Sequence, residues 1–221
     1  MRYIILILLL AASASFAQTN APPPSLLPNG GFEEPDPTNS AKPAGWDKLD
    51  GLGVQWVAET NGPANHYIRL NTAVSEKDYV ASCQAAGLDK WVFPNPNGGA
   101  IAGTYGLSYY SDNLPVATGQ AYRLSFRYRG PSGGGKVWAR GYGLIQGVER
   151  QRYETIVNCR GGNDGWISFS QCFHPTKHTP TVTRMRIMLY AYWPPGIYAF
   201  DDVTLTPVSE AEWLADHREN E

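Results

Sequence analysis

Residues 122–129 have the sequence YRLSFRYR, in which apolar or aromatic side chains alternate with polar ones. In an extended strand, two tyrosines, a leucine and a phenylalanine fall on one face, and three arginines and a serine fall on the other. This alternation predicts a half-buried β-strand. We expect its aromatic face to pack in a hydrophobic core and its arginine face to point away from that core.

The same period of two recurs along the chain and predicts an all-β fold. Further strands are expected at residues 54–58, 66–70, 106–110, 136–144, 152–158, 166–173, 183–192 and 198–206. About eight or nine short strands joined by glycine- and proline-rich turns are typical of an antiparallel β-sandwich. A capping motif that starts at Ser209 predicts one short helix after the last strand, up to about residue 217.

The chain has 221 residues, a length that suits one domain of this kind. Its sequence predicts a signal peptide at 1–17, a proline-rich lead-in at 18–25, the sandwich domain at 26–207 and a helical or frayed tail at 208–221. A buried helix is the alternative for the first segment, but the small residues at its end and the prolines that follow oppose it. We therefore expect a secreted or periplasmic protein without membrane insertion after processing.

Charge and cysteine content restrict the function further. The formal net charge is −2, which argues against a nucleic-acid-binding protein, because such proteins are usually strongly basic. Cys83, Cys159 and Cys172 allow at most one disulfide. A bridge between the last two requires the strand after the glycine-rich turn at 161–165 to cross to another sheet, so the pairing is left open.

Motifs at both ends of the domain resemble those of a known superfamily. The opening sequence LLPNGGFE at 26–33 is followed by PAGW at 43–46, GQAYRLSFRY occupies 119–128, and YAFDDVTL at 198–205 closes the domain. This set resembles the carbohydrate-binding modules of families 4, 9, 16 and 22, which are galactose-binding-like jelly rolls. The resemblance implies a non-catalytic jelly-roll domain that binds a polysaccharide or oligosaccharide. Residues 71–105 match none of these motifs.

The resemblance also implies a structural calcium ion where the opening and closing segments meet. The family's acidic ligands correspond to Glu33 and to Asp201 or Asp202, and carboxylate oxygens are ligands that calcium prefers. Strand alternation puts Asp201 on the face of Val203 and Leu205, which we expect to face the core. A carboxylate that faces inward needs a cation or strong donors, so Asp201 is favoured over Asp202. The alternative is that these carboxylates accept hydrogen bonds from backbone N–H groups.

Aromatic and arginine side chains directed away from the core are the candidate glycan-binding residues. Flat rings stack on the C–H faces of sugars, and arginines bind hydroxyl groups or, in an anionic glycan, carboxylates and sulfates. The candidates are Trp138, Arg140, Tyr142, Arg127, Tyr190 and Trp193. We expect a concave sheet face to carry them, which requires 136–144 to lie in the same sheet as 122–129. Ordinary core packing and a site at the edge loops, with Trp193 at its rim, are the alternatives.

Enzymatic motifs are not found in the sequence, which predicts that the protein is not an enzyme. It contains no G-x-S-x-G or H-E-x-x-H motif, and no pair of carboxylates is distinguished by its spacing. His174 and His178 are four residues apart in a proline-rich segment and would form at most a weak metal site. The alternative function is a structural or adhesion module of the cell envelope that binds a protein partner, which a large exposed apolar patch would favour.

Overall fold

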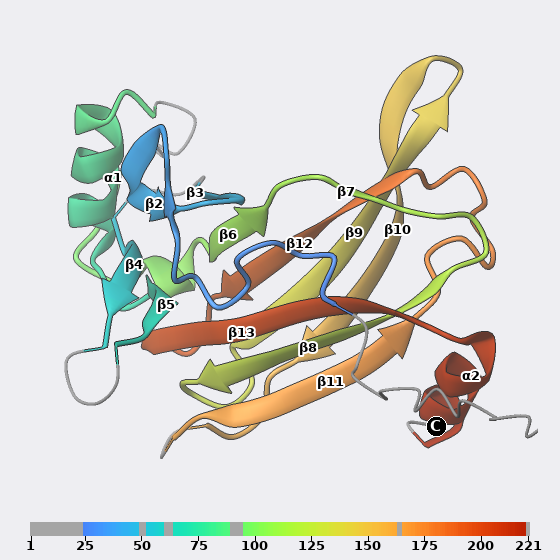
Figure 1. The fold of residues 1–221 in the computed structure, drawn as a ribbon. Helices are drawn as coiled ribbons and strands as arrows, with labels where there is room; N and C mark the ends of the chain where they lie inside the picture. Colours follow the sequence, from blue (N-terminus) through green and yellow to red (C-terminus); the bar gives the residue numbers. More distant parts are fainter. Residues whose placement is uncertain (1–23, 49–51, 60–63, 89–94, 163–164, 220–221) are drawn as a thin grey trace, which may run out of the picture.

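The computed structural model describes residues 24–48, 52–59, 64–88, 95–162 and 165–219 (Figure 1). The predicted signal peptide and residues 18–23 of the predicted lead-in lie outside these ranges. Within them, no helix is long and apolar enough to cross a membrane.

Two antiparallel sheets pack face to face around one hydrophobic core (Figure 1). The six-stranded sheet has the order β10-β9-β12-β6-β3, with β7 beside β12, and its strands are β3 (Trp46–Lys48), β6 (Leu107–Ser111), β7 (Leu114–Pro115), β9 (Gly135–Ile145), β10 (Val148–Asn158) and β12 (Arg184–Ala191). The five-stranded sheet has the order β11-β8-β13-β5-β4, and its strands are β4 (Val54–Ala58), β5 (His66–Asn71), β8 (Ala121–Arg129), β11 (Ile167–Phe173) and β13 (Ile197–Val208). A small hairpin is formed by β1 (Pro35–Asp36) and β2 (Asn39–Pro43). The predicted all-β sandwich is confirmed.

The core is built from the alternation that the sequence predicts. Along β8, the aromatic and aliphatic side chains are buried and the arginines are half-buried. Phe126 and Tyr128 contact Phe200 of the neighbouring β13, with ring centroids 6.5 and 5.4 Å apart. From the opposite sheet, Val137 and Ile187 are also fully buried. Burial of each large apolar side chain contributes about 1.5–3 kcal/mol to stability.

The prediction that residues 136–144 lie in the same sheet as residues 122–129 is wrong. β8 belongs to the five-stranded sheet, whereas β9 belongs to the six-stranded sheet. The short connection between them crosses from one sheet to the other, and its Gly133 has a φ of 93°, a conformation that favours glycine. At Gly134 a Cβ would lie 2.2 Å from the Tyr198 hydroxyl, so the backbone passes too close to β13 for a side chain. β8 and β9 are therefore consecutive in the sequence but do not lie in one sheet.

Among the described residues, the sequence analysis missed one α-helix of ten residues. The helix α1 (Glu76–Ala85) lies within residues 71–105, and Ser75 caps it, because the Ser75 side chain accepts a hydrogen bond from the Asp78 N–H. A short 3₁₀ helix, η2 (Ile101–Gly103), follows. The predicted C-terminal helix is confirmed as α2 (Glu210–Glu219), and a reciprocal capping box joins Ser209 and Glu212 before its first turn.

All three cysteines are buried and none forms a disulfide. Cys159 directly follows β10 and Cys172 lies in β11, and these strands do lie in different sheets, as a bridge between the two residues would require. Burial raises the pKa of the Cys159 thiol, which keeps it in its unreactive neutral form.

Candidate functional site

The outer face of the six-stranded sheet gathers arginine, lysine and aromatic side chains from three neighbouring strands. In the ladder between β9 and β12, Tyr142 lies opposite Arg184, and Arg140 lies opposite Arg186. Directly opposed residues of an antiparallel pair point to the same face. We call this surface the cationic face, and it consists of Tyr110, Lys136, Trp138, Arg140, Tyr142, Arg184, Arg186 and Tyr190, all of them half-buried.

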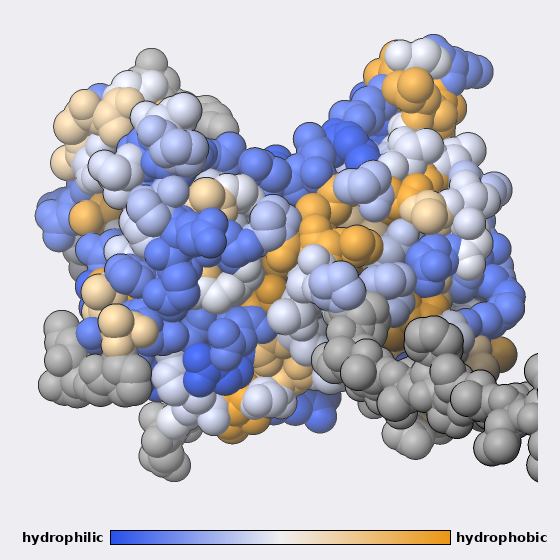
Figure 2. Space-filling model, viewed as in Figure 1, coloured by the Kyte–Doolittle hydropathy of each residue, from blue (hydrophilic) through white to orange (hydrophobic). Residues whose placement is uncertain are grey.

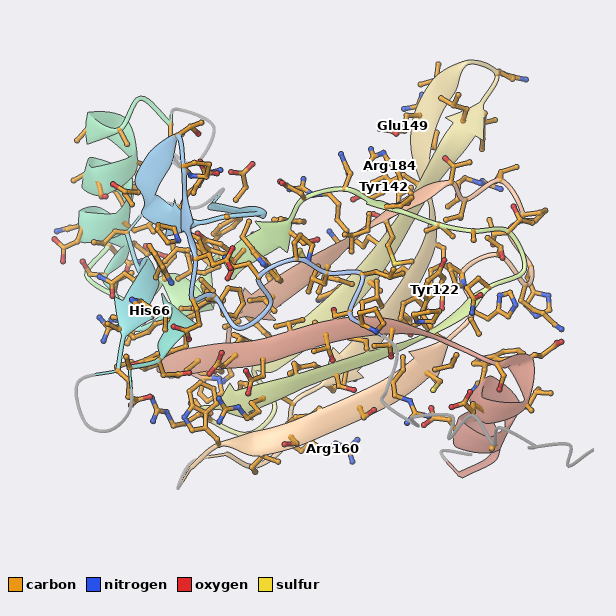
Figure 3. The ribbon with its side chains drawn as sticks, in the orientation of Figure 1. His66, Tyr122, Tyr142, Glu149, Arg160 and Arg184 are labelled. Atoms are coloured by element: carbon orange, nitrogen blue, oxygen red, sulfur yellow. The ribbon has the colours of Figure 1, made fainter. Side chains whose placement is uncertain are left out.

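The base of the raised β9–β10 hairpin forms one end of the cationic face. Figure 3 places Tyr142, Arg184 and Glu149 together there. In the space-filling view, the outline of the molecule is notched between this hairpin and the block that carries α1 and β2 (Figure 2). Tyr142 and Arg184, at one end of the cationic face, lie on the hairpin side of this notch (Figure 3).

Three guanidinium groups on this face lie over aromatic rings. The Arg140 guanidinium carbon lies 4.7 Å from the Trp138 ring centroid. The corresponding distances are 4.3 Å for Arg184 over Tyr142 and 4.8 Å for Arg186 over Tyr110. These cation–π contacts hold the guanidinium planes in place and leave their edges able to donate hydrogen bonds.

Two of the four cations on this face have carboxylate partners. Arg184 binds Glu149, and this hydrogen bond lowers the pKa of the glutamate, while Arg140 Nε lies 3.2 Å from a Glu154 oxygen. Arg186 Nε instead donates to the carbonyl oxygen of Ser111 at 2.7 Å. Among the described residues, neither Arg186 nor Lys136 forms an ion pair, so the face keeps an excess of positive charge.

A pocket of about 420 Å³ borders the cationic face where β12 ends. It is lined by residues 102–106 and by Tyr190, Tyr192 and Trp193. The two tyrosine rings are stacked with centroids 5.9 Å apart, and the Lys136 ammonium lies 5.1 Å from the Tyr192 centroid. Trp193 is 56% exposed, so it forms part of the pocket rim and is not buried beneath the loop. A Cβ on Gly106 would lie 2.1 Å from the Tyr190 hydroxyl, which shows how closely that ring packs on the backbone.

The predicted candidates are only partly brought together. Trp138, Arg140, Tyr142 and Tyr190 lie on the cationic face, and Trp193 borders it. Arg127 does not, because β8 belongs to the other sheet. The candidate list missed Arg184 and Arg186, although both alternate with buried residues along β12 and so point away from the core.

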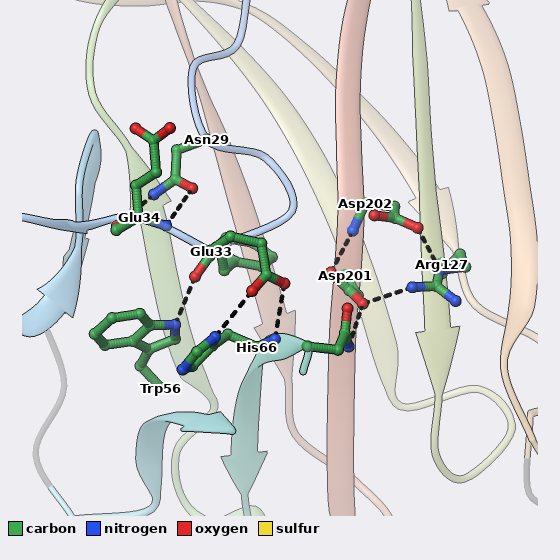
Figure 4. Close-up of polar contacts among 10 residues, drawn as sticks. Asn29, Glu33, Glu34, Trp56, His66, Arg127, Asp201 and Asp202 are labelled. Atoms are coloured by element: carbon green, nitrogen blue, oxygen red, sulfur yellow. Dashed lines mark hydrogen bonds and ion pairs between the residues drawn. The ribbon is translucent and has the colours of Figure 1, made fainter. Parts of the chain in front are cut away.

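Arg127 instead holds two aspartates of the closing strand (Figure 4). One guanidinium nitrogen, Nη2, lies 2.7 Å from Asp201 Oδ2, and Nε lies 2.6 Å from Asp202 Oδ2. Asp201 is fully buried, and its Oδ2 also accepts a hydrogen bond from the Asn65 amide. Burial raises the pKa of the Asp201 carboxyl, and these hydrogen bonds oppose that effect.

The prediction that Asp201 shares the core face of Val203 and Leu205 is wrong. Asp201 lies directly opposite Arg127 in the ladder, on the outer face of the five-stranded sheet. The register shifts between Asp201 and Thr204, and Asp202 has a φ of 49°. This bulge breaks the strict alternation of the strand. Residues an even number of positions apart, such as Asp201 and Val203, therefore point to opposite faces when the bulge lies between them.

The opening and closing segments meet as the motifs predict. The Leu26 N–H donates a hydrogen bond to the Leu205 carbonyl oxygen at 2.7 Å, and the Val203 N–H donates one to the Gly30 carbonyl oxygen at 2.8 Å. Both carboxylate oxygens of Glu33 contact His66, one through its backbone N–H at 2.8 Å and the other through Nδ1 at 2.9 Å (Figure 4).

This arrangement does not fit a preformed calcium site. The carboxylates of Glu33, Asp201 and Asp202 already contact protein donors, and the Arg127 guanidinium supplies positive charge beside the two aspartates. In the described ranges, no group of three or more histidine, cysteine or acidic side chains is placed to hold a metal ion. Calcium here stays a prediction, and its binding requires Arg127 or His66 to give up a carboxylate oxygen.

Thermal unfolding with and without metal tests the calcium prediction. An ion bound only by the folded protein raises the melting temperature by mass action. Calcium binding at Glu33 and Asp201 therefore predicts that a chelator lowers the melting temperature, that added calcium restores it, and that Glu33→Gln removes this response. A melting temperature that ignores both additions would leave the carboxylates as ion-pair and hydrogen-bond partners only.

Comparisons with known proteins show similarity at the level of the fold. The sequence matches no protein-family model and no curated protein. Among solved structures, the enzymatically active domain of tailspike protein 4 from bacteriophage CBA120 matches with a TM-score of 0.53 and 13% identity, over 83% of this chain and 21% of that one. The arabinose-bound MgGH51 α-L-arabinofuranosidase has a TM-score of 0.52 and 15% identity, over 83% of this chain and 26% of the other. This chain thus spans only about a quarter of the length of either.

A cyclase from Fischerella sp. TAU matches along nearly its whole length. Its TM-score is 0.51 and its identity 16%, over 82% of this chain and 95% of the cyclase. Solved carbohydrate-binding modules of families 16 and 22 also match, each with a TM-score of 0.46. The three matches with a TM-score above 0.5 show similarity of fold alone.

Proposed function

We propose that this protein is a non-catalytic glycan-binding module whose cationic face binds an acidic polysaccharide or oligosaccharide. The observation that carries the proposal is the set of three guanidinium groups stacked on rings of one sheet face. Because Arg186 has no carboxylate partner among the described residues, its charge favours a ligand that brings its own carboxylate or sulfate. The signal-peptide features of residues 1–17 support a secreted or periplasmic location.

The chemistry of the face supports binding without catalysis. A guanidinium group held over a ring loses little conformational freedom when it binds, and its planar edge matches a carboxylate. Glycosidases need two carboxyl groups that flank the scissile bond. The acidic side chains beside this face, Glu149 and Glu154, are each bound to an arginine.

A glycan array that includes acidic and neutral polysaccharides of plants and algae tests the proposal. We expect binding to acidic members at micromolar to millimolar affinity, weakened by added salt because exposed charges are screened. Binding to none of the glycans would overturn the proposed function.

Gly106→Ala provides a test of the pocket beside the face. The new methyl group would meet the Tyr190 hydroxyl, so the Tyr190 ring has to move out of its stack with Tyr192. We expect several-fold weaker glycan binding, measured by affinity electrophoresis. Gly165→Ala is the control, because a Cβ there meets nothing within 4 Å and Gly165 does not line the pocket. Equal affinities of the two variants would exclude the Tyr190 pocket from the binding surface.

The second candidate function is adhesion to a protein partner through the tip of the β9–β10 hairpin. Leu144 is 64% exposed and Val148 is 47% exposed at this tip, which Figure 2 shows as an orange patch on the raised hairpin. Exposed apolar groups of this kind favour a protein contact. If adhesion is the function, Leu144→Ser abolishes it and Arg186→Gln does not, whereas glycan binding gives the reverse result.

A further inference from the structure

A second cavity lies between the β1–β2 hairpin and the edge strands of the two sheets. Its volume is about 490 Å³. Its lining comes from β2, β3, β4 and β6, and it consists of Asn39, Ala41, Lys42, Asp47, Val54, Gln55, Trp56 and Tyr109. None of these residues is among the eight of the cationic face, although Asp47 lies opposite Tyr110 in the ladder between β3 and β6. The cavity therefore needs its own explanation.

The charged groups of this cavity are fixed in place. Lys42 Nζ lies 2.7 Å from Asp47 Oδ1 and 3.4 Å from Asp36 Oδ2. The other oxygen of Asp36 accepts hydrogen bonds from Thr38, through its backbone N–H at 2.8 Å and its hydroxyl at 2.6 Å. The Asp47 side chain is 47% exposed, so its carboxylate is accessible to a ligand. Lys42 and Asp47 give the lining one donor group and one acceptor group, and Asp36 adds a second negative charge to this cluster.

The aromatic wall of the cavity is also held in position. The Trp56 indole N–H donates to the Phe32 carbonyl oxygen at 2.8 Å, and its ring packs against His66 with centroids 5.0 Å apart. At the preceding position of β4, Gln55 Oε1 accepts a hydrogen bond from Arg69 Nε at 2.9 Å. A large ring and a side-chain amide therefore line the same cavity as the ion pair, and both are preorganised.

This combination suits a polyhydroxylated ring. An aromatic face contacts the apolar C–H face of a sugar, a carboxylate accepts hydrogen bonds from hydroxyl groups, and ammonium and amide groups donate to them. The two carboxylates around Lys42 disfavour an acidic ligand, in contrast to the excess positive charge of the cationic face. We propose that this cavity is a second saccharide site, which binds a neutral sugar residue. It does not depend on the function proposed for the cationic face.

Titration of the full chain with neutral trisaccharides, followed by NMR of the tryptophan indole N–H signals, tests this site. The probes are cellotriose, xylotriose, mannotriose and galactotriose, each raised to about 10 mM to reach weak affinities. The Trp56 signal is identified by its absence in Trp56→Phe. We expect at least one probe to shift this signal, to leave the Trp138 signal unchanged, and to do so equally at low and high salt.

Two variants locate the binding. Asp47→Asn removes the charge of the accepting carboxylate and is expected to weaken binding at least tenfold. Asp112→Asn changes another exposed aspartate, outside the cavity, and should bind as the unchanged protein does. No shift of the Trp56 signal with any probe, or equal affinities of the two aspartate variants, would overturn the second site. Arg186→Gln is expected to leave this titration unaffected, so failure of the second site and failure of the cationic face are distinguishable.

Discussion

Replacement of Arg127 by alanine is expected to destabilise the protein by about 3 kcal/mol at pH 7. The guanidinium group is the cationic partner of Asp201, whose side chain is fully buried. Without it, the donors that remain to that carboxylate among the described residues are Asn65 and the Asp202 N–H. Loss of one partner of a buried ion pair costs about 3–5 kcal/mol, and the lower end applies because the Arg127 side chain is 35% exposed. Urea unfolding of the two proteins measures the difference.

The deficit of Arg127→Ala should depend on pH. Burial raises the pKa of Asp201, so the folded state binds more protons than the unfolded state between the ordinary aspartate pKa of about 3.9 and the raised value. Stability attributable to this group therefore falls as the pH rises through the folded pKa. Because removal of Arg127 raises that pKa further, the deficit should shrink from pH 7 toward pH 4.

Asp202→Asn is the matched control for Arg127→Ala. It removes an ion pair with the same guanidinium group, but the Asp202 side chain is 54% exposed, so the loss should stay below about 1 kcal/mol. A loss as small for Arg127→Ala, or a deficit independent of pH, would show that Asp201 does not need this cation.

Arg186→Gln is expected to weaken binding of an acidic polysaccharide about 10- to 100-fold. A hydrogen bond to a charged group contributes about 1.5–3 kcal/mol, and about 1.4 kcal/mol corresponds to a tenfold change in affinity. Arg186 is the arginine of the cationic face that has no described carboxylate partner, so no described carboxylate of the protein neutralises its charge. Affinity electrophoresis gives the ratio of dissociation constants.

Arg160→Gln is the charge-matched control for Arg186→Gln, because Arg160 is exposed and lies away from the cationic face (Figure 3). Equal affinities of the two variants would show that Arg186 contributes to binding only through the net charge of the protein. Thermal melts of both variants check that the fold is retained.

The sequence predicted the core of the fold because the core depends on local alternation. Residues 122–129 carry the pattern of a half-buried strand, and β8 has the predicted burial at each of these positions. Sheet membership was not predictable in the same way, because the connection through Gly134 crosses between the sheets, whereas residues 122–129 and 136–144 were expected in one sheet. The helix α1 was missed because its apolar residues are few, although the Ser75–Asp78 spacing was a capping signal.

The candidate site was predictable only as far as alternation continued. Trp138, Arg140 and Tyr142 follow the period of two along β9 and share one face, as the sequence indicated. Asp201 was assigned to the wrong face because a bulge at the next residue changes the phase of β13. The second saccharide site draws on four separate strands, and no local pattern brings their side chains together.

The most direct test of the cationic face compares two forms of one polysaccharide, polygalacturonate and its carboxyl-reduced neutral derivative, in affinity gels run with the unchanged protein. The two polymers share their linkages and differ in the charged group. Our account predicts that polygalacturonate retards the protein, that salt weakens this retardation, and that the reduced polymer retards it much less. Equal retardation by both polymers, or retardation by neither, would contradict the claim that this face binds acidic glycans.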